Sequence, residues 1–175
     1  MHHPALAPVR VRLPVRVGCA AALVELIILV GLQASGKSTF FHERFAETHQ
    51  HVSKDLFPNN RHKNRRQEHL LRAALSAGRS VVVDNTNPTP EERRPLVRLG
   101  HEHGAKVLCY YFEASVSECL RRNEAREGKA RVPDVAIYAT AKKLLVPSIE
   151  EGFAELRCVR LKGSTFEVLP SSRGA

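Results

Sequence analysis

A glycine-rich stretch that directly follows a short apolar segment constrains the fold of this chain more than any other feature. Residues 31–39, with the sequence GLQASGKST, match the pattern G-x-x-x-x-G-K-S/T, and the five residues before them are all apolar. Gly31 and Gly36 allow the backbone to curl so that successive N–H groups point inward and form an anion-binding nest. The sequence therefore predicts a strand over 26–30, a phosphate-binding loop over 31–39 and a helix after the loop.

The residues of this loop carry the groups that a bound nucleoside triphosphate requires. Lys37 is expected to reach the β and γ phosphates, and Ser38 is expected to place its hydroxyl on Mg²⁺. Thr39 is expected to support the loop or to touch the α phosphate. A glycine turn arising by chance is the alternative, and the strand before the loop disfavours it. The predicted nucleotide-binding residues of the loop are Gly31, Gln33, Ala34, Ser35, Gly36, Lys37, Ser38 and Thr39.

Apolar runs and helical patterns alternate along the whole chain. Strands are expected at 26–30, 51–53, 80–84, 106–112 and 155–161, and a hairpin adds 165–169. Such alternation predicts an α/β fold with a mainly parallel five-stranded sheet and helices on both faces. Ligands of such sheets bind beyond the carboxyl ends of the strands, so the polar residues that follow each strand are the candidates for a site.

Composition narrows the class of protein further. A chain of 175 residues with 43% hydrophobic residues suits one globular domain with a proper core. A net charge of +9 attracts polyanions such as nucleic acid, phosphorylated metabolites or an anionic membrane, and charge kept for solubility is the alternative. The four cysteines lack C-x-x-C spacing, which favours reduced thiols in a cytoplasmic protein. The apolar run before the loop is interrupted by Glu25 and is too short to span a membrane.

Two carboxylates follow predicted strands on the same side of the sheet as the loop. Asp55 ends the second strand and is a candidate general base for a substrate hydroxyl, with a turn cap as the alternative. Asp84 follows a buried strand, the Walker-B arrangement in which a carboxylate holds Mg²⁺ directly or through water. Asn85 and Asn87 lie next to Asp84 and are expected either to orient substrate or to build the turn before Pro88.

A basic helix end further along the chain is the candidate for a lid. Arg122 and Arg126 are four residues apart, so they share one helix face and can neutralise charge on a transferring phosphoryl group. A solvated basic helix end is the alternative. The charged segment 61–66 is expected either to grip a nucleic-acid backbone or to form a solvated helix face, and the nine histidines show no ligand pattern.

With these residues in place, the chain resembles the kinase domain of 5′-hydroxyl polynucleotide kinases. The similarity spans about residues 26–160, and the D-N-T-N-P element together with the R-N-x-x-R lid is its most specific part. The sequence has Ser53-Lys54 where the family usually has Asn-Arg before the catalytic Asp, and Pro58 where the phage-type enzymes have Arg. The matching segments are 31–39, 52–55, 84–88, 122–126 and 132–133.

The resemblance implies a P-loop kinase fold with a basic lid, and it implies ATP and Mg²⁺ as cofactors. In this family pattern Asp55 activates the 5′-hydroxyl, and Lys37 and Ser38 serve ATP and Mg²⁺. Asp84 supports the site, and Arg122 and Arg126 clamp the phosphates from the lid. Arg122 is also one of the expected nucleotide-binding residues. The expected catalytic residues are thus Asp55, Lys37, Arg126 and Arg122, and the expected metal-binding residues are Ser38 and Asp84.

Three functions remain open on the sequence alone. The first is an ATP-dependent kinase acting on the 5′-hydroxyl end of a nucleic acid. The second is a kinase for a small hydroxyl metabolite such as a sugar, nucleoside or antibiotic, and the third is a non-catalytic ATP-binding regulator. The predicted P-loop kinase domain covers 24–170, and 1–23 form an irregular tail that could be an annotation extension. No membrane partner is expected, and the sequence predicts no oligomeric state.

Overall fold

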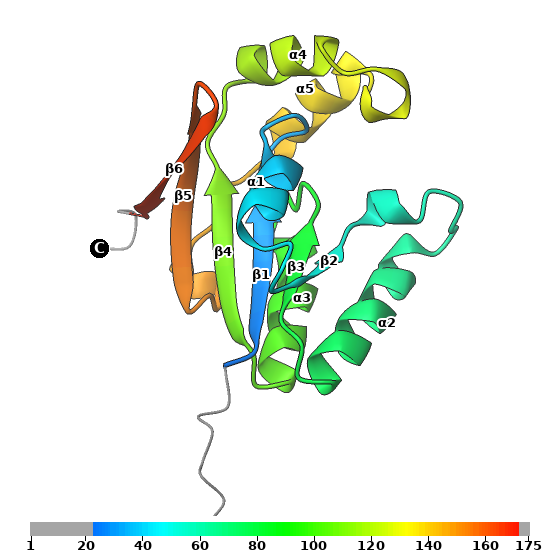
Figure 1. The fold of residues 1–175 in the computed structure, drawn as a ribbon, viewed down its shortest axis with the longest axis vertical. Helices are drawn as coiled ribbons and strands as arrows, with labels where there is room; N and C mark the ends of the chain where they lie inside the picture. Colours follow the sequence, from blue (N-terminus) through cyan, green and yellow to red (C-terminus); the bar gives the residue numbers. More distant parts are fainter. Residues whose placement is uncertain (1–22, 172–175) are drawn as a thin grey trace, which may run out of the picture.

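The strands of this chain form a single sheet in a computed structural model that describes residues 23–171. The sheet is built from β1 (Glu25–Val30), β2 (Gln50–Val52), β3 (Val81–Asp84), β4 (Lys106–Phe112), β5 (Glu155–Lys162) and β6 (Thr165–Pro170). Their spatial order is β2-β3-β1-β4-β5-β6 (Figure 1). The first five strands run parallel, and β6 pairs antiparallel with β5. The predicted mainly parallel α/β sheet is confirmed, and the predicted hairpin extends it from five strands to six.

Helices cover both faces of this sheet, as predicted. They are α1 (Lys37–Arg44), α2 (Lys63–Ser76), α3 (Pro90–Glu102), α4 (Val116–Glu124) and α5 (Asp134–Lys143), with short 3₁₀ turns η1 (Lys54–Leu56), η2 (Gly128–Ala130) and η3 (Ile149–Glu151). Thr89 caps α3, and Ser115 with Glu118 forms a capping box at α4. Among the described residues, no helix is both long and apolar enough to cross a membrane. The predicted tail over 1–23 lies outside the described residues except for its last residue.

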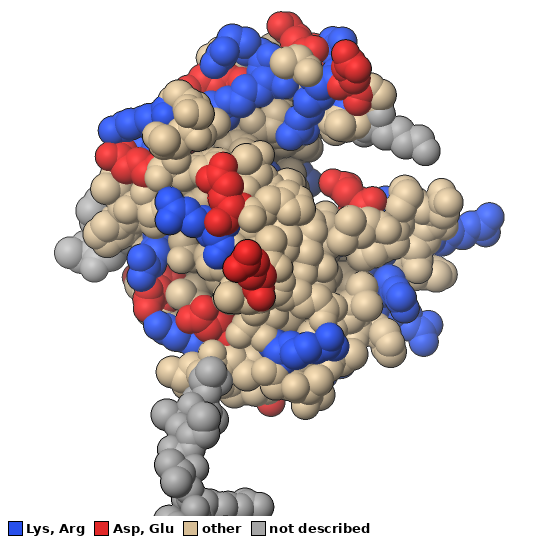
Figure 2. Space-filling model, in the orientation of Figure 1, with Lys and Arg blue, Asp and Glu red and all other residues tan. Residues whose placement is uncertain are grey.

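Two units project beyond the carboxyl ends of the strands. The α4–α5 pair lies over the ends of β1 and β4, and η1 with the start of α2 projects on the side of β2 (Figure 1). Figure 2 shows a hollow, open to solvent, between these two units. The parallel topology therefore aims every strand-following residue of interest at one edge of the molecule.

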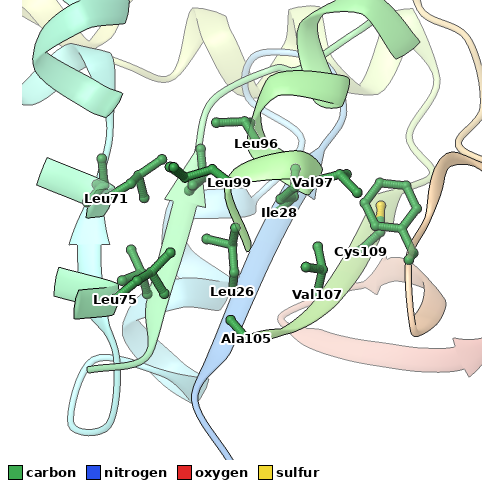
Figure 3. Close-up of a cluster of buried hydrophobic side chains, with 14 of the residues drawn as sticks. Leu26, Ile28, Leu71, Leu75, Leu96, Val97, Leu99, Ala105, Val107 and Cys109 are labelled. Atoms are coloured by element: carbon green, nitrogen blue, oxygen red, sulfur yellow. The ribbon is translucent and has the colours of Figure 1, made fainter. Parts of the chain in front are cut away.

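The core consists of two apolar layers, one on each face of the sheet. Leu26 and Ile28 of β1 face α2 and α3, where Leu71, Leu96 and Leu99 pack against them (Figure 3). The intervening residues Ile27 and Leu29 face the opposite layer, with Phe40, Phe41, Phe112 and Phe166. A strand buried on both faces has a continuous apolar sequence, which explains the unbroken run that precedes the phosphate loop. Cys109 and Cys119 are buried free thiols.

Gly100 allows α3 to approach the sheet closely. A Cβ atom added at this position would lie 2.5 Å from Val107 Cγ2 and 3.0 Å from Leu26 Cδ2. We expect Gly100→Ala to lower the free energy of unfolding by about 1–3 kcal/mol, because overpacking outweighs the higher helix propensity of alanine. Urea denaturation measures the change.

A double-mutant cycle provides the control for this prediction. Val107→Ala removes the methyl group that the new Cβ would meet, so Gly100→Ala should cost less in that background. An equal cost in both backgrounds would show that close packing against Val107 is not what requires glycine at this position.

Candidate active site

The loop between β1 and α1 has the conformation of an anion-binding nest. Gly31 has φ 152° and Gly36 has φ 100°, both in the region that favours glycine, and Ala34 has φ 59°. A Cβ on Gly31 would also lie 2.9 Å from Phe112 Cβ. The first turn of α1 follows directly, with its N-terminus at Lys37. The predicted strand–loop–helix unit is confirmed, and its geometry suits a phosphate group.

Lys37 is buried inside this loop. Its Nζ donates hydrogen bonds to the carbonyl oxygens of Gly31 at 3.1 Å and Leu32 at 2.5 Å, and to Ser35 Oγ at 3.3 Å. Burial lowers the pKa of Lys37 to about 8, and the negative charge of Asp84 partly opposes this shift. The ammonium group is therefore held at the centre of the nest by groups that a phosphate would replace.

The lowered pKa of Lys37 predicts how the affinity for a nucleoside triphosphate depends on pH. Below about 8 the free chain already carries the Lys37 charge, so affinity should be flat there. Bound phosphates raise the pKa of Lys37, so binding above that pH must take up a proton and the Kd should rise about tenfold per pH unit. Isothermal titration calorimetry across this range measures the Kd and the proton uptake.

Lys37→Met is the control for this titration, because its side chain carries no proton to gain. The variant should bind nucleotide weakly and without proton uptake in the alkaline range. A wild-type Kd that stays constant well above the Lys37 pKa would contradict the assignment of this lysine to the phosphates.

Ser38, Asp84 and His51 form a cluster beside the loop. Ser38 Oγ donates a 2.6 Å hydrogen bond to Asp84 Oδ2, and His51 Nε2 lies 3.1 Å from the same oxygen. Burial alone would raise the pKa of the Asp84 carboxyl, but hydrogen bonds from His51 and Ser38 and the charge of Lys37 hold the pKa below its ordinary value. The buried, ionised carboxylate of Asp84 thus contacts the hydroxyl of Ser38, the predicted ligand of Mg²⁺.

This oxygen pair fits a magnesium ion that is shared with phosphates. The residues that the structure describes contain no group of three or more His, Cys, Asp or Glu side chains placed to hold a metal. Mg²⁺ is typically bound by one or two protein oxygens together with waters and substrate phosphates, rather than by an all-protein cage. Ser38 Oγ and Asp84 Oδ2 supply such a partial set next to the nest.

His51 was not predicted as a site residue, yet it contacts the buried carboxylate. Its ring stacks on Phe41 with centroids 4.1 Å apart and an interplanar angle of 14°. The contact with Asp84 depends on the pairing of β2 with β3, in which His51 is opposite Val82. The register of two strands far apart in sequence sets this contact, so only the expected adjacency of the second and third strands could have indicated it.

Hydrogen bonds fix the turn that carries Asp55. Lys54 N–H donates to Asn85 Oδ1 at 3.0 Å, and Asn85 Nδ2 donates to Gln67 Oε1 at 2.7 Å. Ser53 Oγ accepts from Asp55 N–H at 3.3 Å and caps η1. The end of β2 is therefore tied to the end of β3, which holds Asp55 at a constant position relative to Asp84.

The D-N-T-N-P element also joins the two central strands. Asn87 Nδ2 donates to the carbonyl of Leu29 at 2.8 Å, and Gly31 N–H donates to the carbonyl of Thr86 at 3.0 Å. The Asn87 carbonyl in turn accepts from Arg93, whose fully buried guanidinium makes a bidentate pair with Glu151. Asn87 thus builds the turn, whereas Asn85 supports the Asp55 segment.

The α4–α5 unit lies against the phosphate loop. Arg122 Nη1 donates to the Ala34 carbonyl at 3.3 Å, and Gln33 Nε2 donates to Thr140 Oγ1 at 2.9 Å. Asn123 is fully buried and bonds both the N–H and the carbonyl of Val132, which closes the loop between the helices. The R-N-x-x-R motif therefore combines two arginines with the asparagine that holds the lid together.

The charged site residues converge on Lys37. Asp84, Arg126 and Asp55 all act electrostatically on its ammonium group, and they come from three different segments of the chain. Asp55 is exposed, so its carboxylate is accessible from solvent. Arg126 Nη1 donates to the Ala130 carbonyl at 3.3 Å and is half-buried. The structure thus brings the predicted catalytic residues to one place.

A pocket of about 420 Å³ adjoins the outer side of the loop. It lies between the lid arginines, the start of α1 and the β5–β6 hairpin, and its lining includes Thr39, Arg122, Arg126, Gly163, Ser164 and Phe166. Its volume falls in the range of small-molecule sites. The pocket connects the predicted phosphate site with the turn of the hairpin, which the sequence alone did not associate with the site.

Known proteins are similar to this chain in sequence and in fold. A polynucleotide phosphatase/kinase of Schizosaccharomyces pombe is 27% identical over 146 residues, which is 79% of this chain but 34% of that protein, so the chain spans about a third of its relative. A structure of the Pnkp1/Rnl/Hen1 RNA repair complex matches 87% of this chain and 50% of that chain, with 24% identity and a TM-score of 0.61. The predicted resemblance to polynucleotide kinases is confirmed.

The fold itself is shared more widely. A gluconokinase from Sinorhizobium meliloti, 17% identical, matches 79% of this chain and 83% of its own with a TM-score of 0.56. The family model described as an AAA domain matches residues 26–145, which is more than half of the chain. The chain therefore belongs to this AAA domain family, and its fold is that of the P-loop kinases.

Proposed function

We propose that this chain, through a domain covering 24–170, is an ATP-dependent kinase that transfers the γ phosphate to the 5′-hydroxyl end of a polynucleotide. The observation that carries the proposal is the buried Lys37 inside the phosphate-binding loop, with the Ser38–Asp84 oxygen pair at 2.6 Å beside the loop and Arg122 bonded to it. Together with Asp55, which follows β2, these residues supply an acidic metal ligand, a phosphate clamp and a general base around one phosphate-binding lysine, which is the set that phosphoryl transfer needs.

The nucleotide occupies the loop and the pocket beside it. Its phosphates replace the carbonyl and hydroxyl partners of Lys37, and its nucleoside lies in the pocket between Arg122 and the β5–β6 hairpin. Ser38 and Asp84 would hold Mg²⁺, and the ion would supply positive charge to neutralise the phosphates during transfer. Reduced buried thiols such as Cys109 fit a cytoplasmic location, where ATP is supplied.

The transfer step uses Asp55 as the proton acceptor. The acceptor hydroxyl attacks the γ phosphorus while its proton passes to the Asp55 carboxylate. The bond between the γ phosphorus and the bridging oxygen to the β phosphate breaks, and ADP leaves. Lys37, Arg122 and Arg126 neutralise the charge on the oxygens of the transferring group.

Three observations support a polynucleotide acceptor. The hollow between the α4–α5 unit and η1 is open to solvent, as a chain end requires (Figure 2). Exposed cations lie just before α2 and in its first turn, including Arg61, Arg65 and Arg66. Such charges bind a phosphate backbone without regard to base sequence. The similarity to the polynucleotide phosphatase/kinase of Schizosaccharomyces pombe points to the same acceptor class.

A small hydroxyl metabolite is the second candidate acceptor. A pocket of about 360 Å³ begins at Lys54, next to Asp55, and its volume suits a small molecule. The fold shared with a gluconokinase is consistent with such a substrate. A non-catalytic regulator is the third reading, and it would leave the exposed carboxylate of Asp55 without a chemical role.

A radiolabel transfer assay separates these candidates. The wild-type chain is incubated with γ-³²P-labelled ATP and Mg²⁺, together with 5′-hydroxyl DNA, 5′-hydroxyl RNA, gluconate or free nucleosides. The proposal predicts label at oligonucleotide 5′ ends, and no label on oligonucleotides whose 5′ end is already phosphorylated. Label on the small alcohols alone would assign the metabolite function, and label on none of them would favour the regulator.

A further inference from the structure

A second pocket lies between α2 and α3, on the other side of the Asp55 turn from the nucleotide loop. Its volume is about 360 Å³, and it opens beside Lys54. Leu71 of α2 and Leu96 and Leu99 of α3 face each other there (Figure 3). These leucines are buried at 0–6% exposure, and Pro95 joins them in the lining. The pocket thus has Pro95 and the edge of the leucine core as its apolar floor.

The polar groups of this pocket suit a neutral heterocycle better than an anion. The carboxylates of Glu68, Glu91 and Glu92 accompany the guanidinium groups of Arg72 and Arg98 in its lining, so the opposite charges offset each other. Glu68 and Arg72 are paired at 2.9 Å. With Lys54 the lining holds three cations and three carboxylates, so it has no net charge to favour an anion, whereas its floor of leucine and proline suits a flat uncharged ring.

Two amide side chains can hydrogen-bond the edge of such a ring. Asn64 is exposed at the first turn of α2, and Gln67 lies one turn further into the pocket wall. Gln67 Oε1 accepts from Asn85, but within residues 23–171 no hydrogen bond engages the NH₂ group of Gln67 or the amide of Asn64. An amide offers both a donor and an acceptor, which is the pattern that the edge of a nucleobase presents.

The pocket wall and the proposed catalytic turn form one hydrogen-bonded unit. Gln67 bonds Asn85, and Asn85 bonds the backbone N–H of Lys54, the residue before Asp55. A 5′-hydroxyl group and its nucleobase are carried by the same sugar ring. Lys54 lines the pocket mouth and directly precedes Asp55, so a nucleoside with its hydroxyl at Asp55 has its base within reach of the pocket.

We propose that the α2–α3 pocket receives the nucleobase of the terminal nucleoside of the acceptor. This inference rests on the proposed function and specifies how the acceptor is held: the base enters the pocket and the 5′-hydroxyl faces Asp55. The strand then leaves along the exposed cations at the start of α2. A base held in this way contributes to binding through apolar contact and through the amides of Asn64 and Gln67.

The test compares two 5′-hydroxyl oligonucleotides that differ only at the first residue, which carries either a base or an abasic tetrahydrofuran. The wild-type kcat/KM should fall about tenfold or more when the base is missing. Asn64→Trp fills the pocket mouth from an exposed position, so it should lower kcat/KM for the normal end to the abasic level and leave the abasic end unchanged. Ala73→Trp, at an exposed position on the same helix that lines neither this pocket nor the groove beside Arg65 and Arg66, is the matched control and should preserve the preference.

The outcomes separate this inference from the function on which it rests. Equal kcat/KM for the two ends in the wild type, or an equal loss on both ends in a folded Asn64→Trp variant, overturns the pocket assignment and leaves the kinase proposal standing. No transfer to any 5′-hydroxyl oligonucleotide contradicts the proposed function and this inference together. Free nucleosides are tested in the same assay. If they are labelled, and Asn64→Trp lowers kcat/KM for them as it does for the normal end, the base pocket is supported and the acceptor is a single nucleoside.

Discussion

Asp55→Asn is expected to lower kcat for phosphoryl transfer by about 10²–10⁴-fold, with nucleotide affinity unchanged. The substitution keeps the size of the side chain and removes the group that accepts the proton of the acceptor hydroxyl. Asp55 lies in a turn held by Ser53 and Asn85, so the variant should fold normally. Initial rates at saturating ATP and acceptor measure kcat, and calorimetry measures nucleotide binding.

Glu47→Gln is the matched control, because it removes one negative charge from an exposed residue after α1 that is outside the site. Its kcat should equal that of the wild type. An Asp55→Asn variant that retains the wild-type rate would show that another group takes the proton, or that the transfer needs no base. A loss of nucleotide affinity in that variant would instead point to a role of Asp55 in the nucleotide site.

Arg126→Ala is expected to reduce kcat by about 10³-fold or more, the scale of an arginine that neutralises a transferring phosphoryl group. Arg126 lines the nucleotide pocket with Arg122, and its charge acts on Lys37. Because its contribution arises mainly as charge develops in the transition state, the KM for ATP should change much less than kcat. Steady-state kinetics separates the two constants.

Arg121→Ala is the control for the lid. Arg121 is exposed near the end of α4, whereas Arg126 lies in the loop after Glu124 and not on one helix face with Arg122 as expected. Arg121 does not line the pocket, so the same loss of charge should leave kcat near the wild-type value. Equal effects of the two substitutions would show that the lid acts only through its general charge. Arg126→Lys tests geometry, since a lysine keeps the charge but not the planar fork of donors.

Local patterns were sufficient to predict the fold and the edge of the sheet at which the candidate residues lie. The apolar run before Gly31, the glycine pattern and the polar residues that end the strands specify a parallel sheet with its ligands at one edge. Parallel strands bring Ser38 and Asp84 together although they are 46 residues apart, and the structure has them in contact. Thr89 accepts a capping hydrogen bond from Glu92 N–H without forming a full capping box, whereas Ser115 and Glu118 form one at α4.

Contacts that depend on tertiary packing could not be predicted from local sequence patterns. His51 reaches Asp84 only through the register of β2 against β3, and its sequence context resembles that of any strand residue. The buried Asn123 side chain joins α4 to the loop before α5, because the chain returns to it at Val132 and forms two hydrogen bonds with it. The α2–α3 pocket results from the spacing of two helices, which no periodicity in either helix specifies.

A crystal structure with a non-hydrolysable ATP analogue, Mg²⁺ and a short 5′-hydroxyl oligonucleotide tests the proposed transfer site. Lys37 Nζ is expected to leave the carbonyls of Gly31 and Leu32 for the β and γ phosphates. The terminal hydroxyl is expected to lie between the γ phosphorus and the Asp55 carboxylate. An Asp55 side chain directed away from the γ phosphate, with no acceptor hydroxyl between them, would exclude Asp55 as the general base.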